Sequence, residues 1–137
     1  MIINAENSIL GRMATYACKK ALLGEKIDIV NCEKAIITGS KEEIVEKYRK
    51  RAELGGPFKG PFISRLPDKF VRRVIRGMLP YKQGKGREAF KRIMCYVSMP
   101  NEFHDKKIEK IKEADISRVK SLKYTTVYEL CRALRNK

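Results

Sequence analysis

The chain has 137 residues and a mass of 15.8 kDa, which fits one compact domain and excludes two large ones. Lysine and arginine number 31 against 16 aspartate and glutamate residues, and the resulting net charge of +15 points to a polyanionic partner such as nucleic acid or an anionic membrane. No run approaches the ~20 apolar residues of a membrane span, and residues 1–6 lack a signal-peptide pattern, so we expect a soluble cytoplasmic protein with no membrane partner.

The first forty residues alternate between strand and helix patterns. Apolar residues recur at helical spacing from Ile9 to Ala21, with Asn7 or Ser8 as the expected N-cap and Gly24 as the expected end. Short β-branched or aromatic runs predict strands at 2–3, 27–30 and 35–38, and a further one at 93–97. These strands are expected to form one small sheet.

Two capping boxes mark further helices. Ser40 with Glu43 precedes one apolar stripe, and Thr126 with Glu129 precedes another near the carboxyl end. The layout is α/β, with helices covering a mostly parallel sheet. The stretch 102–123 has mixed charges and weak periodicity, so its structure stays open.

Most of the positive charge lies in residues 55–95. This stretch holds eleven basic and two acidic residues, together with six of the nine glycines and four of the five prolines. Its Gly/Pro-rich parts are expected to be extended and solvated. A basic insertion of this composition suits a segment that lies along a phosphate backbone, and the alternative is a mobile surface loop.

A helix is predicted from Pro67 to the residue before Pro80. Its apolar residues fall in one half of the helical wheel, and its basic residues fall in about a third of the wheel on the other side: Lys69, Arg72, Arg73 and Arg76. Only Asp68 relieves their repulsion, so we expect a bound anion, with the arginines suited to forked phosphate contacts. The alternative is a solvated basic face. Because they lie opposite the apolar stripe, the arginines are expected to point away from the core.

The pattern Gly84-x-Gly86-x-x-Ala89 matches the loose dinucleotide fingerprint, but a proline-terminated helix precedes it instead of the required strand. The spacing of a Walker phosphate loop is also absent. We therefore expect no nucleotide cofactor. The glycines would expose amide groups to an RNA backbone, a helix would begin near Arg87, and Lys82, Lys85 and Arg87 would add charge.

Residues suited to catalysis or metal binding are scarce. The four cysteines, Cys18, Cys32, Cys95 and Cys131, are far apart and are expected to be reduced and buried. The one histidine, His104, has no evident partner, and no nucleophile motif is present. We expect no enzyme activity, no catalytic residue, no metal, no cofactor and no small-molecule substrate.

Three segments resemble, in order and spacing, the universal ribosomal protein family thirteen of the large subunit, the L13 family. They are Ser8-Ile9-Leu10-Gly11-Arg12-Met13-Ala14, residues 30–39 (VNCEKAIITG) and residues 73–80 (RVIRGMLP). Residues 56–61 and 65–69 resemble the archaeal and eukaryotic branch, and the short carboxyl end resembles archaeal members.

The resemblance implies a single domain, residues 1–137, with a three-layer α/β/α fold around a four-stranded parallel sheet and a basic Gly/Pro-rich extension. It also implies a structural constituent of the large ribosomal subunit that binds large-subunit rRNA through a segment at about 55–95, contacts neighbouring ribosomal proteins and supports assembly. The alternative is a stand-alone RNA-binding regulator outside the ribosome. Gly11 and Gly77 are expected to serve close packing or chain turning. The expected RNA-binding residues are Lys59, Arg65, Lys69, Arg72, Arg73, Arg76, Lys82, Lys85 and Arg87.

Overall fold

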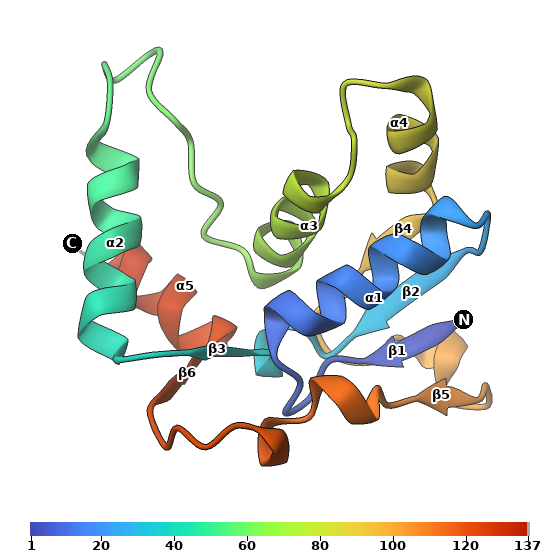
Figure 1. Ribbon diagram of the computed structural model, residues 1–137. Coiled ribbons are helices and arrows are strands. Elements are labelled where there is room, and N and C mark those ends of the chain that lie inside the picture. The colour runs from blue at the N-terminus through green and yellow to red at the C-terminus, as the bar shows by residue number, and fades with distance from the viewer. Residues whose placement is uncertain (137) are drawn as a thin grey trace.

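The computed structural model describes residues 1–136 (Figure 1). Its helices are α1 (Leu10–Leu22), α2 (Lys41–Glu53), α3 (Pro67–Met78), α4 (Gly84–Lys91) and α5 (Val127–Arg135). Its strands are β1 (Ile2–Asn4), β2 (Ile27–Val30), β3 (Ile36–Thr38), β4 (Ile93–Cys95), β5 (Ile108–Glu109) and β6 (Tyr124–Thr126). Four strands form a parallel sheet in the order β4-β2-β1-β5, while β3 and β6 pair antiparallel in a separate ribbon.

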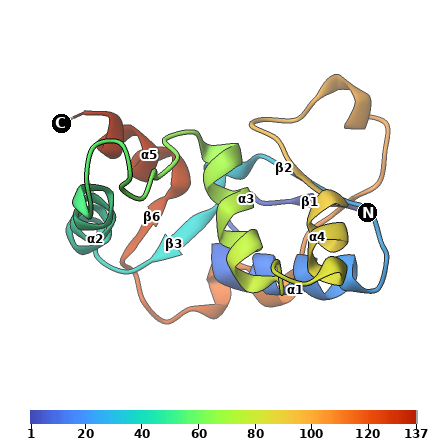
Figure 2. The same ribbon diagram turned by 90° about the horizontal axis from the view of Figure 1, so that it is seen from above.

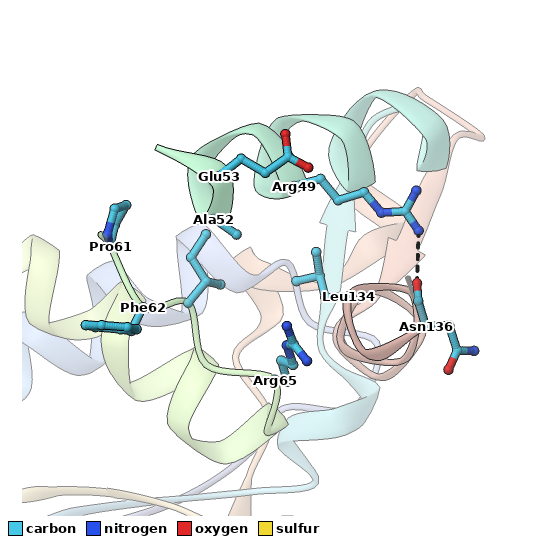
Figure 3. A pocket seen from close by; sticks show the side chains of 9 residues that line it. Arg49, Ala52, Glu53, Pro61, Phe62, Arg65, Leu134 and Asn136 are labelled. Atoms are coloured by element: carbon cyan, nitrogen blue, oxygen red, sulfur yellow. Dashed lines mark hydrogen bonds between the residues drawn. The ribbon is translucent and has the colours of Figure 1, made fainter. Parts of the chain in front are cut away.

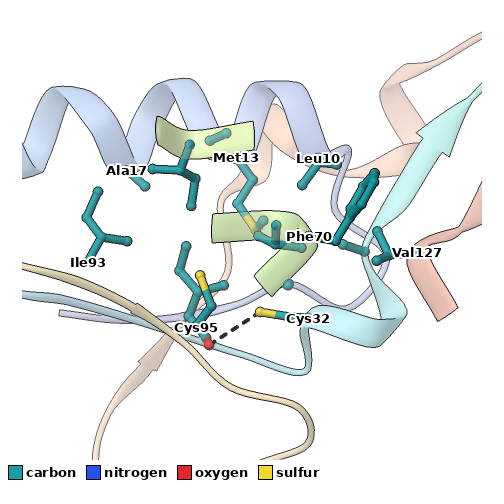
Figure 4. Close-up of a cluster of buried hydrophobic side chains, with 14 of the residues drawn as sticks. Leu10, Met13, Ala17, Cys32, Phe70, Ile93, Cys95 and Val127 are labelled. Carbon is teal, nitrogen blue, oxygen red and sulfur yellow. Dashed lines mark hydrogen bonds between the residues drawn. The ribbon is translucent and has the colours of Figure 1, made fainter. Parts of the chain in front are cut away.

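Alternating side chains of the parallel sheet face two different layers. Ile3 and Ile29 point into the main core, which helices α1, α3 and α4 cover, as Figure 4 shows for part of this cluster. Ile2 and Val30 point to the other face, where they pack with Phe103 in a smaller cluster. That face is covered by the chain that follows β4, including one 3₁₀ turn, Asn101–Phe103. The α/β class and the four-stranded parallel sheet are therefore confirmed.

One predicted strand lies elsewhere than expected. The run 35–38 does form a strand, but it pairs with β6 instead of joining the parallel sheet, with Ile37 opposite Thr125. The fourth place in the sheet is taken by β5, which pairs with β1 and comes from the stretch whose structure the sequence left open. Strand propensity identified Ile36 and Ile37 correctly, but it carries no information on the pairing partner.

The expected helix caps are confirmed in part. Thr126 Oγ1 accepts a hydrogen bond from Glu129 N at 3.2 Å, and Gly24 takes a left-handed φ of 101° just beyond α1. Ser40 is the N-cap of α2 but makes no side-chain capping bond. The N-cap of α1 is Ile9, so the prediction of Asn7 or Ser8 there is wrong. Ser8 is instead fully buried, and its carbonyl oxygen accepts a hydrogen bond of 2.9 Å from Ile36 N, the first residue of β3.

Seen from above, α3 lies across α1, with α2 and α5 on one side and α4 on the other (Figure 2). Residues 54–66 connect α2 to α3 and contain no helix or strand. Within the described part of the chain, no helix is long and apolar enough to cross a membrane.

Candidate nucleic-acid interface

Helix α3 places its basic residues opposite the core. Pro67 occupies its first turn with Asp68, and both suit the amino end of a helix. On the inner face, Phe70, Val71 and Ile75 are buried among α1, β4 and α5. Lys69 and Arg73 are exposed on the outer face. The predicted separation of an apolar and a basic stripe is therefore present in α3.

Two of the α3 arginines are fixed by aromatic rings. The Arg72 guanidinium carbon lies 4.6 Å from the centre of the Phe90 ring of α4, and that of Arg76 lies 5.2 Å from the centre of the Tyr81 ring. Tyr81 and Phe90 contact each other edge to face, with their ring centres 5.5 Å apart. Cation–π contacts of this kind restrict where the guanidinium groups lie.

The burial of these two arginines corrects an expectation. Arg72 and Arg76 are half-buried and do not simply point into solvent. Arg72 Nε is buried and has no hydrogen-bond partner within residues 1–136. A helical wheel correctly places these residues on the outer side of α3. It cannot show that Phe90 of α4 and Tyr81 of the preceding turn pack beside them and cover them in part.

Arg73 joins α3 to the segment before it. Its Nη1 donates a hydrogen bond of 3.2 Å to the carbonyl oxygen of Phe62. Lys59 and Arg65 lie in this same connecting segment, and both are exposed. The bond to Phe62 therefore connects the outer face of α3 with the part of the chain that carries Lys59 and Arg65.

The remaining three candidates lie at the amino end of α4. Lys82, Lys85 and Arg87 are all exposed. Helix α4 begins at Gly84, not near Arg87, so the glycines expected in an open loop lie in its first turn. That turn contains no acidic residue, and its amide groups give the helix end a partial positive charge that adds to the three side chains.

The positive charge of these nine residues is not neutralised by carboxylates of the described chain. Within residues 1–136 the six ion pairs involve other cations, such as Lys50 with Glu46 and Arg92 with Glu88. From Lys59 to Arg87 the candidates occupy the connecting segment, the outer face of α3 and the start of α4. They lie in one continuous region of the sequence, from residue 59 to residue 87, which carries a net positive charge.

Gly86 closes the turn between α3 and α4 tightly. A Cβ atom at this position would overlap the carbonyl group of Pro80 and would lie 2.9 Å from Tyr81 N. By contrast, Cβ atoms added at Gly11 and Gly77 would meet nothing within 4 Å, and neither residue has a left-handed φ. The expectation that Gly11 and Gly77 serve close packing or turning is therefore wrong for this structure.

The substitution Gly86→Ala should lower the free energy of unfolding by about 1–3 kcal/mol, because backbone atoms of Pro80 and Tyr81 must move. Gly84→Ala is the matched control, since a Cβ there meets nothing within 4 Å. Urea unfolding of the two variants measures the difference. Equal stability of the two would contradict the tight contact at Gly86.

One pocket of the described chain is lined without a hydroxyl or thiol nucleophile, and the cysteine thiols are buried. A pocket of about 620 Å³ lies between α2, α5 and residues 61–65, and its described lining contains no histidine, cysteine or serine (Figure 3). All four cysteines are buried, and burial raises the pKa of Cys18 and Cys131 to about 11, which disfavours the nucleophilic thiolate. Among residues 1–136 no three metal-ligating side chains cluster.

Comparison with known proteins identifies the family of this chain. The sequence model of the family "Ribosomal protein L13" matches residues 1–102, which include the whole of α3 and α4. The chain belongs to the ribosomal protein L13 family. Family membership also supports the expectation that it is not an enzyme.

Similar L13 family members come from archaea. The large ribosomal subunit protein uL13 of Methanopyrus kandleri is 47% identical over 135 residues, covering 97% of this chain and 85% of the relative. That of Methanosarcina barkeri is 40% identical over 137 residues, covering 99% and 98%. That of Methanococcus maripaludis is 54% identical over 104 residues, covering 73% and 76%. The archaeal branch of the family, expected from the sequence, is confirmed.

Sequence reasoning missed Phe90 and Tyr81 as neighbours of the basic residues. Tyr81 follows Arg76 by five positions beyond a predicted helix stop, and Phe90 follows Arg72 by eighteen. No local pattern links such pairs. The adjacent apolar pair Ala89-Phe90 in α4 could have shown that this part of the helix packs, but not against which residue.

Proposed function

We infer that the chain is a structural constituent of the large ribosomal subunit and acts there by binding large-subunit rRNA. The observation that carries this proposal is the uncompensated basic region on α3, α4 and their connections, in a chain of the L13 family. The proposal treats residues 1–137 as one domain, located on the ribosome, with an RNA-binding segment at about 55–95.

The binding residues are proposed in three groups. Lys59 and Arg65 contact RNA from the connecting segment, and Lys82, Lys85 and Arg87 contact it at the start of α4. Between them are the four residues of α3: Lys69, Arg72, Arg73 and Arg76. Arginine forks and lysine ammonium groups contact phosphate oxygens, so the backbone and shape of a folded RNA are recognised. Holding RNA segments together on one rigid face is how the chain supports subunit assembly beside neighbouring ribosomal proteins.

The purified chain should bind archaeal large-subunit rRNA more tightly than small-subunit rRNA of equal length, and the native protein should sediment with large subunits. Filter binding and sucrose-gradient sedimentation measure these results. Equal affinity for both RNAs and sedimentation apart from subunits would favour the stand-alone regulator. The relatives named large ribosomal subunit protein uL13 do not favour that alternative.

A further inference from the structure

The connecting segment holds an aromatic ring in solvent. Phe58 is 93% exposed, and Phe62 in the same segment is 66% exposed. An aromatic side chain can bury about 150–250 Å² of surface, so a ring left in water is available for a contact outside the chain.

The backbone around Phe58 forms a tight turn. Gly56 carbonyl oxygen accepts hydrogen bonds from Gly60 N at 2.7 Å and from Lys59 N at 3.2 Å. A Cβ at Gly60 would lie 2.8 Å from both the Gly56 and Leu54 carbonyl oxygens, and Gly55 has a left-handed φ of 85°. The turn thus depends on glycine at two positions. It places Phe58 at its tip, between Pro57 and Lys59.

The charge around the ring indicates the partner. Residues 47–66 contain six basic residues and one acidic residue, Glu53. Arg73 holds the carboxyl side of the segment through its bond to the carbonyl oxygen of Phe62, so the chain reaches the outer face of α3 four residues after Phe58. An apolar pocket of another protein would not require these cations. A nucleobase offers a flat π face together with nearby phosphates.

We propose that Phe58 stacks on an unpaired base of the RNA, so that the chain recognises a single-stranded element as well as the phosphate backbone. This inference rests on the proposed function, because it assumes RNA as the partner. The ring is displayed from a turn of the connecting segment and not from paired strands. The base-stacking contact would require an unpaired base at this point of the RNA, a requirement that phosphate contacts alone do not impose.

Affinity for archaeal large-subunit rRNA, measured by filter binding at constant salt, tests the proposal. Phe58→Ala should bind roughly 5- to 150-fold more weakly, with an unchanged salt slope because no phosphate contact is lost. Phe58→Trp should keep the affinity. Leu122→Ala is the control at an equally exposed apolar side chain, 93% exposed, and it should bind as the unchanged protein does. Ultraviolet crosslinking should join RNA to the peptide that contains Phe58.

A second pair of variants leaves the ring in place. Gly60→Ala should weaken binding because the turn must shift, whereas Gly56→Ala should not, since a Cβ at Gly56 meets nothing within 4 Å. If Phe58→Ala binds rRNA normally while Glu substitutions on α3 abolish binding, the stacking contact is overturned and the proposed function stands. If neither change affects binding, the proposed function itself is wrong. Loss of subunit incorporation with normal rRNA affinity would assign Phe58 to a protein contact and also overturn the proposal.

Discussion

Raising the monovalent salt concentration from about 50 to about 200 mM should weaken binding of the chain to large-subunit rRNA about 10³- to 10⁵-fold. The reason is that ~6–10 phosphate contacts release a similar number of condensed counterions. Seven of the nine candidate side chains are exposed and two are half-buried, and none has a carboxylate partner within residues 1–136. Filter-binding titrations at several salt concentrations give the slope of log K against log salt.

That slope should lie between about −5 and −8, which corresponds to this loss of affinity over a fourfold rise in salt concentration. Small-subunit rRNA is the control: it should show a slope of the same sign with weaker binding throughout. A slope near zero for large-subunit rRNA would mean that binding does not depend on phosphate neutralisation. The assignment of the basic region as an RNA-binding surface would then be wrong.

The triple variant Arg72→Glu/Arg73→Glu/Arg76→Glu should bind rRNA about 10²- to 10⁴-fold more weakly, taking about 1–2 kcal/mol for each lost charge-assisted contact. Because Arg72 and Arg76 lie on the rings of Phe90 and Tyr81, this variant should also lose about 1–2 kcal/mol of stability. Urea unfolding and rRNA binding should therefore be measured together at a temperature where the variant is folded.

The matched control is Lys107→Glu/Lys112→Glu/Lys120→Glu. These three residues are exposed and lie outside residues 55–95, and the change in net charge is identical. This control should retain most of the affinity, because position as well as total charge decides binding. If both triple variants lost the same amount of rRNA affinity, the effect would come from net charge alone and not from the position of the arginines. Unchanged affinity in the arginine triple would remove these residues from the binding site.

Local sequence patterns predict where helices and strands form better than they predict which strands pair with each other. The strand at 27–30 and the start of α3 at Pro67 lie where the sequence predicts them. Both predictions rest on local backbone preferences, those of a β-branched run and of a proline in the first turn of a helix. The pairing of β3 with β6 depends on residues almost ninety positions apart, and strand propensity does not encode it. Strand β5 has only two residues, which is too short for a periodic pattern.

The same limit applies to the candidate site. The basic stripe of α3 follows from the spacing of Lys69, Arg72, Arg73 and Arg76, because a helix of 3.6 residues per turn gathers them. Arg72 and Arg76 are half-buried because Phe90 and Tyr81 pack against them. These are tertiary contacts, which the spacing of residues within α3 does not encode. The start of α4 at Gly84 was missed because glycine is a poor helix former and favours a loop assignment.

Helix α3 contributes to the core through one side and carries its arginines on the other, so occupancy of the outer side and the folding equilibrium are linked by mass action. A polyanion at a hundred times its dissociation constant would add about 2.7 kcal/mol to the stability of the native chain. Protein molecules made in excess of this partner would lack that stabilisation and would unfold more often, so cellular proteases would degrade them first. The supply of partner would thereby set how much of the protein persists.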